Sequence, residues 1–113
     1  IMEDSIIRGT TAKTRVKTLR EIGAKEVHMV VSCPPHAFPC HYGIDFSTRG
    51  ELIAAQKSVD EIRDFVGLDS LGYLSIDNLK KATTIPGQDL CFACFNGQYP
   101  VPIEKETSKF CLE

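Results

Sequence analysis

The feature that most constrains this chain is a turn near its start, where an acidic pair, small residues and two hydroxyls follow a short apolar segment. Glu3 and Asp4 come directly after Ile1 and Met2, and the sequence then runs Ser-Ile-Ile-Arg-Gly-Thr-Thr to position 11. Beyond this turn, apolar residues recur at helical spacing. A strand that ends in such a turn and leads into a helix predicts the first half of a βαβ unit.

The next elements complete this unit. Residues 10–22 predict one amphipathic helix that ends near Gly23, and residues 26–32 (EVHMVVS) predict a largely apolar strand of the kind found in parallel sheets. His28 lies within that strand and is interpreted as a core or sheet-face residue, because no catalytic partner is near it in sequence. The turn would then lie at the carboxyl end of the first strand, where open α/β sheets bind ligands.

The later elements follow the same α/β alternation. Two capping boxes, Thr48 with Glu51 and Ser58 with Glu61, each predict the start of a helix. A short apolar run predicts a strand at 71–74, and Ser75 is the predicted N-cap of a helix that continues through residue 81. We therefore expect an α/β domain, a parallel sheet flanked by helices, in residues 1–86. Residues 87–113, which contain a C-x-x-C, are expected to form an irregular tail.

Charge and length exclude several classes of protein. The formal net charge is −2 over 113 residues, and the basic residues are dispersed among acids, so the chain predicts no nucleic-acid partner and no membrane partner. No stretch approaches the roughly 20 apolar residues of a membrane span. The chain also opens on Ile1 rather than on a methionine, which predicts a fragment of a longer polypeptide.

The five cysteines are an odd number, and Cys91 and Cys94 form the C-x-x-C. This usage favours reduced thiols or metal ligation over a secreted disulfide framework. Cys40, in a loop rich in proline, is the candidate for a third ligand. Thiolate sets suit zinc or an iron–sulfur cluster, and ligand softness alone does not choose between these two.

The turn itself has the chemistry of a sugar phosphate site. The carboxylates of Glu3 and Asp4 can accept hydrogen bonds from ribose hydroxyls, while backbone N–H groups and the positive end of a helix can bind phosphate. An ordinary helix start, capped by Thr10 or Thr11 behind a solvated acidic turn, is the alternative. The full nine-residue pattern favours the sugar phosphate site, and the pattern G-x-x-x-x-G-K-[ST] of a Walker loop is absent.

The order of motifs along the chain resembles one family. EDSIIRGTT is similar to the phosphoribosyl pyrophosphate (PRPP) motif of type I phosphoribosyltransferases, and LREIGAKEVH, CPPHAFPCHYGID, ELIAAQKSVDEIRDFVGLDSLGYLS and CFACFNGQYP follow it as in the carboxyl-terminal part of glutamine amidophosphoribosyltransferase. The resemblance implies part of a type I phosphoribosyltransferase-like sheet. It also implies a glycosyltransferase that moves glutamine-derived ammonia to C1 of PRPP, giving 5-phosphoribosylamine, glutamate and pyrophosphate in the first step of de novo purine (IMP) biosynthesis.

The resemblance also implies the site residues. Glu3 and Asp4 are assigned to the ribose hydroxyls and to Mg²⁺, and no catalytic residue is assigned in this segment. The remaining residues of the PRPP site form the 5-phosphate cradle, two of them through backbone alone: Ser5, Arg8, Gly9, Thr10 and Thr11, with Ile6 and Ile7. Glu3 departs from the family, which commonly has Asp there, and the longer side chain shifts the carboxylate but keeps its charge.

The cysteines are assigned in the same way. Some members of the family hold a [4Fe–4S] cluster through four cysteines, and three of these positions match Cys40, Cys91 and Cys94, with the fourth ligand expected outside this chain. Cys33 stands where a serine is usual and Cys111 lies in a variable tail, so neither inherits a role. Both are interpreted as thiols that behave as small apolar residues.

The implied protein is larger than this chain. Its expected partners are PRPP and glutamine as substrates, purine nucleotides as candidate inhibitors, an N-terminal glutaminase region, and further copies of itself in a tetramer, all in the cytoplasm. The fragment alone is expected to be inactive. A non-catalytic PRPP-binding regulator is the first alternative, but it needs a basic surface. A purely structural metal-binding module is the second, and it leaves EDSIIRGTT unexplained.

Overall fold

A single parallel sheet organises the chain. The computed structural model describes residues 1–45, 48–86 and 89–102. Within them the sheet has the order β1-β2-β3, with strands Met2–Glu3, His28–Val31 and Ser70–Tyr73. All pairings are parallel. The predicted α/β class is confirmed. The strand predicted before the turn is present as β1, and the strands predicted at 26–32 and 71–74 are present with slightly different bounds.

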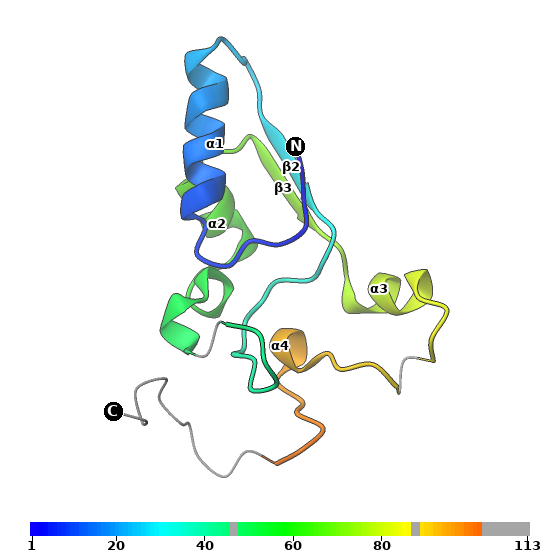
Figure 1. Cartoon of the computed structure of the whole chain (residues 1–113). Helices are drawn as coiled ribbons and strands as arrows, with labels where there is room; N and C mark the ends of the chain where they lie inside the picture. Colours follow the sequence, from blue (N-terminus) through cyan, green and yellow to red (C-terminus); the bar gives the residue numbers. More distant parts are fainter. Residues whose placement is uncertain (46–47, 87–88, 103–113) are drawn as a thin grey trace.

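Two helices cover one face of this sheet. Helices α1, Thr10–Glu21, and α2, Val59–Val66, lie on the same side of the strands (Figure 1). Because successive strand residues point to opposite faces, Met29 and Val31 of β2 face the helices and are buried. The helices contribute residues four positions apart to the same core: Ala12 and Val16 from α1, Ile62 and Val66 from α2.

The opposite face of the sheet carries exposed side chains. Val30 is 56 % exposed, and His28 lies on this same face, where its Nδ1 is 2.8 Å from the Ser70 hydroxyl. The prediction of a sheet-face histidine is therefore confirmed. His28 pairs with this serine and, at 3.3 Å, with the Glu26 carboxylate, and neither partner belongs to the predicted site.

Helix α2 begins as the sequence predicts. The Ser58 hydroxyl accepts a hydrogen bond from the Glu61 N–H, and the Glu61 carboxylate accepts one from the Ser58 N–H at 2.7 Å, so the capping box is complete. Helix α3, Ile76–Ala82, likewise begins at its predicted cap, with the Ser75 hydroxyl accepting from the Asn78 N–H. Both predicted caps are therefore confirmed.

The helix predicted from Thr48 is wrong. Thr48 makes no side-chain cap bond, and two 3-10 turns occupy this region, η1 at Arg49–Glu51 and η2 at Ile53–Ala55. Leu52 between them is extended and fully buried. The Ile53 N–H donates to the Ile7 carbonyl at 2.8 Å. Burial of two adjacent apolar residues and this bond to the turn outweigh the local helical preference.

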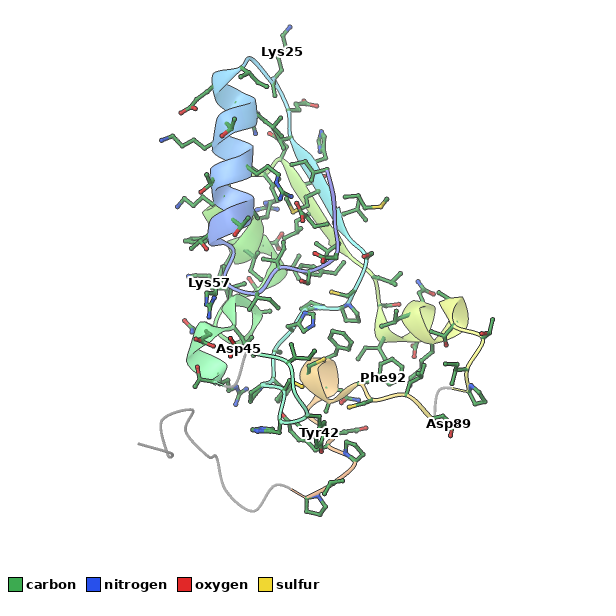
Figure 2. All side chains as sticks on the ribbon, in the orientation of Figure 1. Lys25, Tyr42, Asp45, Lys57, Asp89 and Phe92 are labelled. Atoms are coloured by element: carbon green, nitrogen blue, oxygen red, sulfur yellow. The ribbon has the colours of Figure 1, made fainter. Side chains whose placement is uncertain are left out.

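The segments that follow the strands meet in a second region, below the sheet in Figure 1. The chain from Cys33 onward runs down to α4, Ala93–Asn96, a one-turn helix within the predicted irregular tail. The Ala37 and Phe38 N–H groups both donate to the Cys94 carbonyl at 3.1 Å. Tyr42, labelled in Figure 2, donates its hydroxyl to the Val101 carbonyl. The first two bonds tie the proline-rich loop to the C-x-x-C, and the third ties it to the segment that follows the C-x-x-C.

Candidate functional site

A polar cavity of about 330 Å³ lies at the carboxyl end of β1. Its walls are residues 3–12 together with Arg15, so all nine residues of the predicted motif line it: Glu3, Asp4, Ser5, Ile6, Ile7, Arg8, Gly9, Thr10 and Thr11. The structure therefore brings the predicted site residues together in one hollow. Ile6 is buried in the core beneath the turn, which leaves its backbone as the part nearest the cavity.

The N-terminus of α1 provides donors for an anion. The N-cap is Gly9, which has no side-chain cap bond, and the first turn holds no acidic residue. The first intrahelical bond is donated by the Lys13 N–H to the Gly9 carbonyl at 2.9 Å. Because glycine has no side chain that could accept their hydrogen bonds, the N–H groups of the first turn receive no cap from Gly9. They lie at the positive end of the helix dipole. This arrangement suits a phosphate group.

Gly9 is required by both backbone and space. Its φ of 77° lies in the left-handed region, which L-residues with side chains rarely adopt. A Cβ at this position would lie 3.0 Å from Ile53 Cδ1 and 3.2 Å from Phe65 Cε1. The turn can therefore pass this close to η2 and α2 with glycine, and a larger residue would push it outward.

The Arg8 side chain contacts a carboxylate. Its Nη2 lies 3.0 Å from Glu51 Oε1, and the guanidinium remains 56 % exposed. Arg8 thus braces the turn against η1 while still lining the cavity. The sequence predicts a capping role for this same Glu51, and the structure gives its carboxylate to the ion pair instead.

The two acids differ in their surroundings. Asp4 Oδ1 accepts a hydrogen bond from the Ser5 N–H at 2.7 Å, which shapes the turn locally. Glu3 instead forms an ion pair with Arg15, on the second turn of α1. Sequence reasoning missed Arg15. Its position four residues after Thr11 was the available signal, since that spacing puts both on the helix face that lines the cavity.

The Cys33 thiol and the His36 ring lie next to each other. The Cys33 Sγ and the His36 Nδ1 are 3.8 Å apart. Burial raises the pKa of the Cys33 thiol to about 11, and repulsion from Cys94 and Asp4 adds to this. Burial also lowers the pKa of His36, although Asp4 opposes the shift. Both groups are therefore neutral at pH 7, so the pair is not a thiolate–imidazolium nucleophile.

The cysteines of the C-x-x-C lie near Cys40. Burial raises the pKa of the Cys94 thiol to about 11, and repulsion from Cys40 and then Cys91 adds to it. The Tyr42 N–H donates to Cys40 Sγ at 3.4 Å. Within the described ranges, however, no three His, Cys, Asp or Glu side chains are placed closely enough to hold a metal ion. Cys111 lies outside the described residues.

Comparison with known proteins finds relatives that match nearly the whole chain. The amidophosphoribosyltransferase of Synechococcus elongatus is 50% identical over 115 residues, covering 100% of this chain and 23% of that protein. Chloroplastic amidophosphoribosyltransferase 2 of Arabidopsis thaliana is 48% identical over 110 residues, covering 96% of this chain and 20% of that protein. No family model matches the chain.

A solved structure matches the fold. It is the glutamine PRPP amidotransferase of B. subtilis complexed with ADP and GMP, with a TM-score of 0.84 and 48% identity over 95% of this chain and 24% of that one. The fold and the cavity define an α/β domain of the phosphoribosyltransferase type. The chain belongs to the amidophosphoribosyltransferase family and corresponds to the carboxyl-terminal region of these proteins. It spans about a quarter of the length of these relatives.

This family membership bears on the alternatives. These two relatives are themselves named as transferases, not as regulators or structural metal-binding modules. Within the part of the chain that the structure describes, no helix is long and apolar enough to cross a membrane. The plant relative is chloroplastic, so the cytoplasm stays a prediction for this protein.

Proposed function

We propose that this chain is the PRPP-binding segment of an amidophosphoribosyltransferase, which transfers glutamine-derived ammonia to C1 of PRPP in the first step of purine biosynthesis. The observation that carries the proposal is the cavity, because the nine residues of the predicted PRPP motif line it at a helix N-terminus. Glutamate and pyrophosphate are the expected co-products of 5-phosphoribosylamine.

Residues of the turn have distinct proposed roles. The N–H groups after Gly9, with the hydroxyls of Thr10 and Thr11, hold the 5-phosphate against the N-terminus of α1. Glu3 and Asp4 accept hydrogen bonds from the ribose hydroxyls. Fixing the sugar at both ends orients C1 for in-line displacement, and orientation of this kind lowers the barrier substantially.

The same acids are the proposed ligands of Mg²⁺. Carboxylate oxygens together with ligand phosphates are the donors that this ion prefers, so the donor set fits. When bound, Mg²⁺ would neutralise charge on the departing pyrophosphate. The Asp4 carboxylate, already oriented by the Ser5 N–H, is the better placed of the two acids because Glu3 is paired with Arg15.

We propose that Cys40, Cys91 and Cys94 supply three thiolates to a [4Fe–4S] cluster, with the fourth ligand outside this chain. The proposal is supported by the two hydrogen bonds from the Ala37 and Phe38 N–H groups to the Cys94 carbonyl, which hold the loop of Cys40 against the C-x-x-C. Thiolates are the donors that such clusters require. Cys40→Ser should lower the iron and sulfide content of the anaerobically purified full-length protein, and unchanged content would contradict the assignment.

The partners of the whole protein are proposals of the same kind. They comprise an N-terminal glutaminase region that releases ammonia, further copies in a tetramer, and purine nucleotides as inhibitors. The B. subtilis relative was solved with ADP and GMP, which supports nucleotide binding in the family. We propose the cytoplasm as the compartment.

Enzyme assay tests the proposed function. Full-length protein supplied with PRPP, Mg²⁺ and glutamine should release pyrophosphate, and omission of every nitrogen donor should abolish the release. Asp4→Asn should lower the rate strongly, because a hydrogen bond to a charged group is worth about 1.5–3 kcal/mol. Asp64→Asn, exposed on α2 and outside the cavity, is the matched control. Release that does not depend on a nitrogen donor would contradict the proposal.

A further inference from the structure

Glu3 has an unusual environment for a carboxylate. Its side chain is 16 % exposed, and its Oε1 is shielded from solvent. A charge removed from water is costly unless a counter-ion faces it. The guanidinium of Arg15 is in contact with this shielded oxygen, and it is the cation that the described part of the chain offers to Glu3.

Arg15 reaches Glu3 from a different element. Glu3 ends β1, whereas Arg15 belongs to the second turn of α1, so the ion pair spans the mouth of the turn from strand to helix. Both residues line the 330 Å³ cavity. A glutamate has one more rotatable bond than an aspartate, and holding it in one direction costs more conformational entropy. A planar guanidinium fixes a carboxylate geometrically as well as electrostatically.

We propose that Arg15 is a positioning residue for PRPP: its guanidinium holds the Glu3 carboxylate in the direction of the ribose hydroxyls. This inference rests on the proposed function and adds a residue to it. Arg15 offsets the negative charge of Glu3 in a cavity that must accept a highly anionic ligand. Without the guanidinium, the Glu3 carboxylate would repel the ligand and would leave its fixed position.

The test is a double-mutant cycle in the full-length protein. Calorimetric titration with PRPP and Mg²⁺ is carried out on wild type, Arg15→Met, Glu3→Gln and the double variant. Methionine keeps much of the length of the side chain and removes its charge. Arg15→Met should weaken PRPP binding about tenfold in the wild-type background. In the Glu3→Gln background the same substitution should change Kd by less than about twofold, because the partner is already neutral.

Two further variants separate positioning from general structure. Arg15→Lys should recover part of the lost affinity, because it restores the positive charge but not the planar guanidinium. Lys17→Met is the control that removes a cation from the same helix. Lys17 does not line the cavity and pairs with Glu21, with 3.7 Å between Nζ and Oε1, so this variant should bind PRPP as wild type does. Thermal unfolding of each variant shows whether a loss of binding reflects a loss of fold.

The outcomes distinguish the two levels of the argument. Equal effects of Arg15→Met in both backgrounds, or wild-type affinity of Arg15→Met, would overturn the positioning role while leaving the proposed function in place. Failure of the wild-type protein to bind PRPP would instead refute the proposed function itself. A dependence of the Arg15 effect on Glu3, with recovery by lysine, would support the inference.

Discussion

Replacement of Gly9 by alanine should be among the most damaging small changes in this chain. The residue has a φ of 77°, and a Cβ would meet Ile53 Cδ1 at 3.0 Å and Phe65 Cε1 at 3.2 Å. The left-handed conformation costs an L-residue about 1–2 kcal/mol. Overpacking in a well-packed core adds about 1–3 kcal/mol. We therefore expect Gly9→Ala to lower the free energy of unfolding by about 2–5 kcal/mol.

Two other glycines separate these contributions. Gly23 has a φ of 104°, but a Cβ added there would have no neighbouring atom within 4 Å, so Gly23→Ala should show the conformational cost alone. Gly50 has neither a positive φ nor a close neighbour, so Gly50→Ala should be nearly neutral. Urea unfolding of the three variants, followed by circular dichroism, measures the differences in free energy. A loss for Gly9→Ala that is no larger than the loss for Gly23→Ala would refute the steric part of the reasoning.

Three further predictions concern the elements around the site. Ser58→Ala should lower the free energy of unfolding by about 1 kcal/mol because it removes the N-cap of α2. Thr48→Ala changes a position with no cap bond and should be nearly neutral, and urea titration of the two variants measures the difference. Arg8→Ala and Glu51→Gln should each lower the free energy of unfolding by less than about 1 kcal/mol, and the two effects should not add, because each substitution removes the same partly exposed ion pair. Additive losses in a double-mutant cycle would contradict this pairing. The pKa of His36 is lower in the folded chain than its ordinary value of 6.5, so as the pH drops the unfolded chain binds a proton at this residue before the folded chain does. Stability should therefore fall as the pH drops from about 6.5 toward the pKa of the folded state. Urea midpoints measured between about pH 7 and pH 5 should show this slope, and His36→Gln should remove the part that His36 contributes.

Much of the fold follows from local sequence. Helix α1, the strand at His28–Val31 and the capped start at Ser58 depend on periodicity and short-range hydrogen bonds, which a sequence displays directly. The helix predicted from Thr48 is wrong because the backbone conformation of this region depends on contacts with residues distant in sequence. Leu52 and Ile53 are adjacent and both buried, and the extended backbone at Leu52 that separates the two 3-10 turns is incompatible with a continuous α-helix.

The site divides in the same way. The cavity residues are predictable because they are contiguous, running from Glu3 to Thr11. Arg15 is not, because its role depends on a through-space contact with the end of β1. The influence of the Asp4 charge on the pKa values of Cys33 and His36 depends on how the loop after β2 folds back, and no local pattern encodes that path.

Direct titration of PRPP tests the central claim. Calorimetry of the full-length protein with PRPP and Mg²⁺ should show binding that the double variant Glu3→Gln plus Asp4→Asn weakens by at least about tenfold, because each charged hydrogen bond to a ribose hydroxyl is worth about 1.5–3 kcal/mol. The matched control, Glu21→Gln plus Asp60→Asn, makes the same chemical changes away from the cavity and should bind as wild type does. Wild-type affinity in the Glu3 and Asp4 double variant would contradict the assignment of this turn to the ribose.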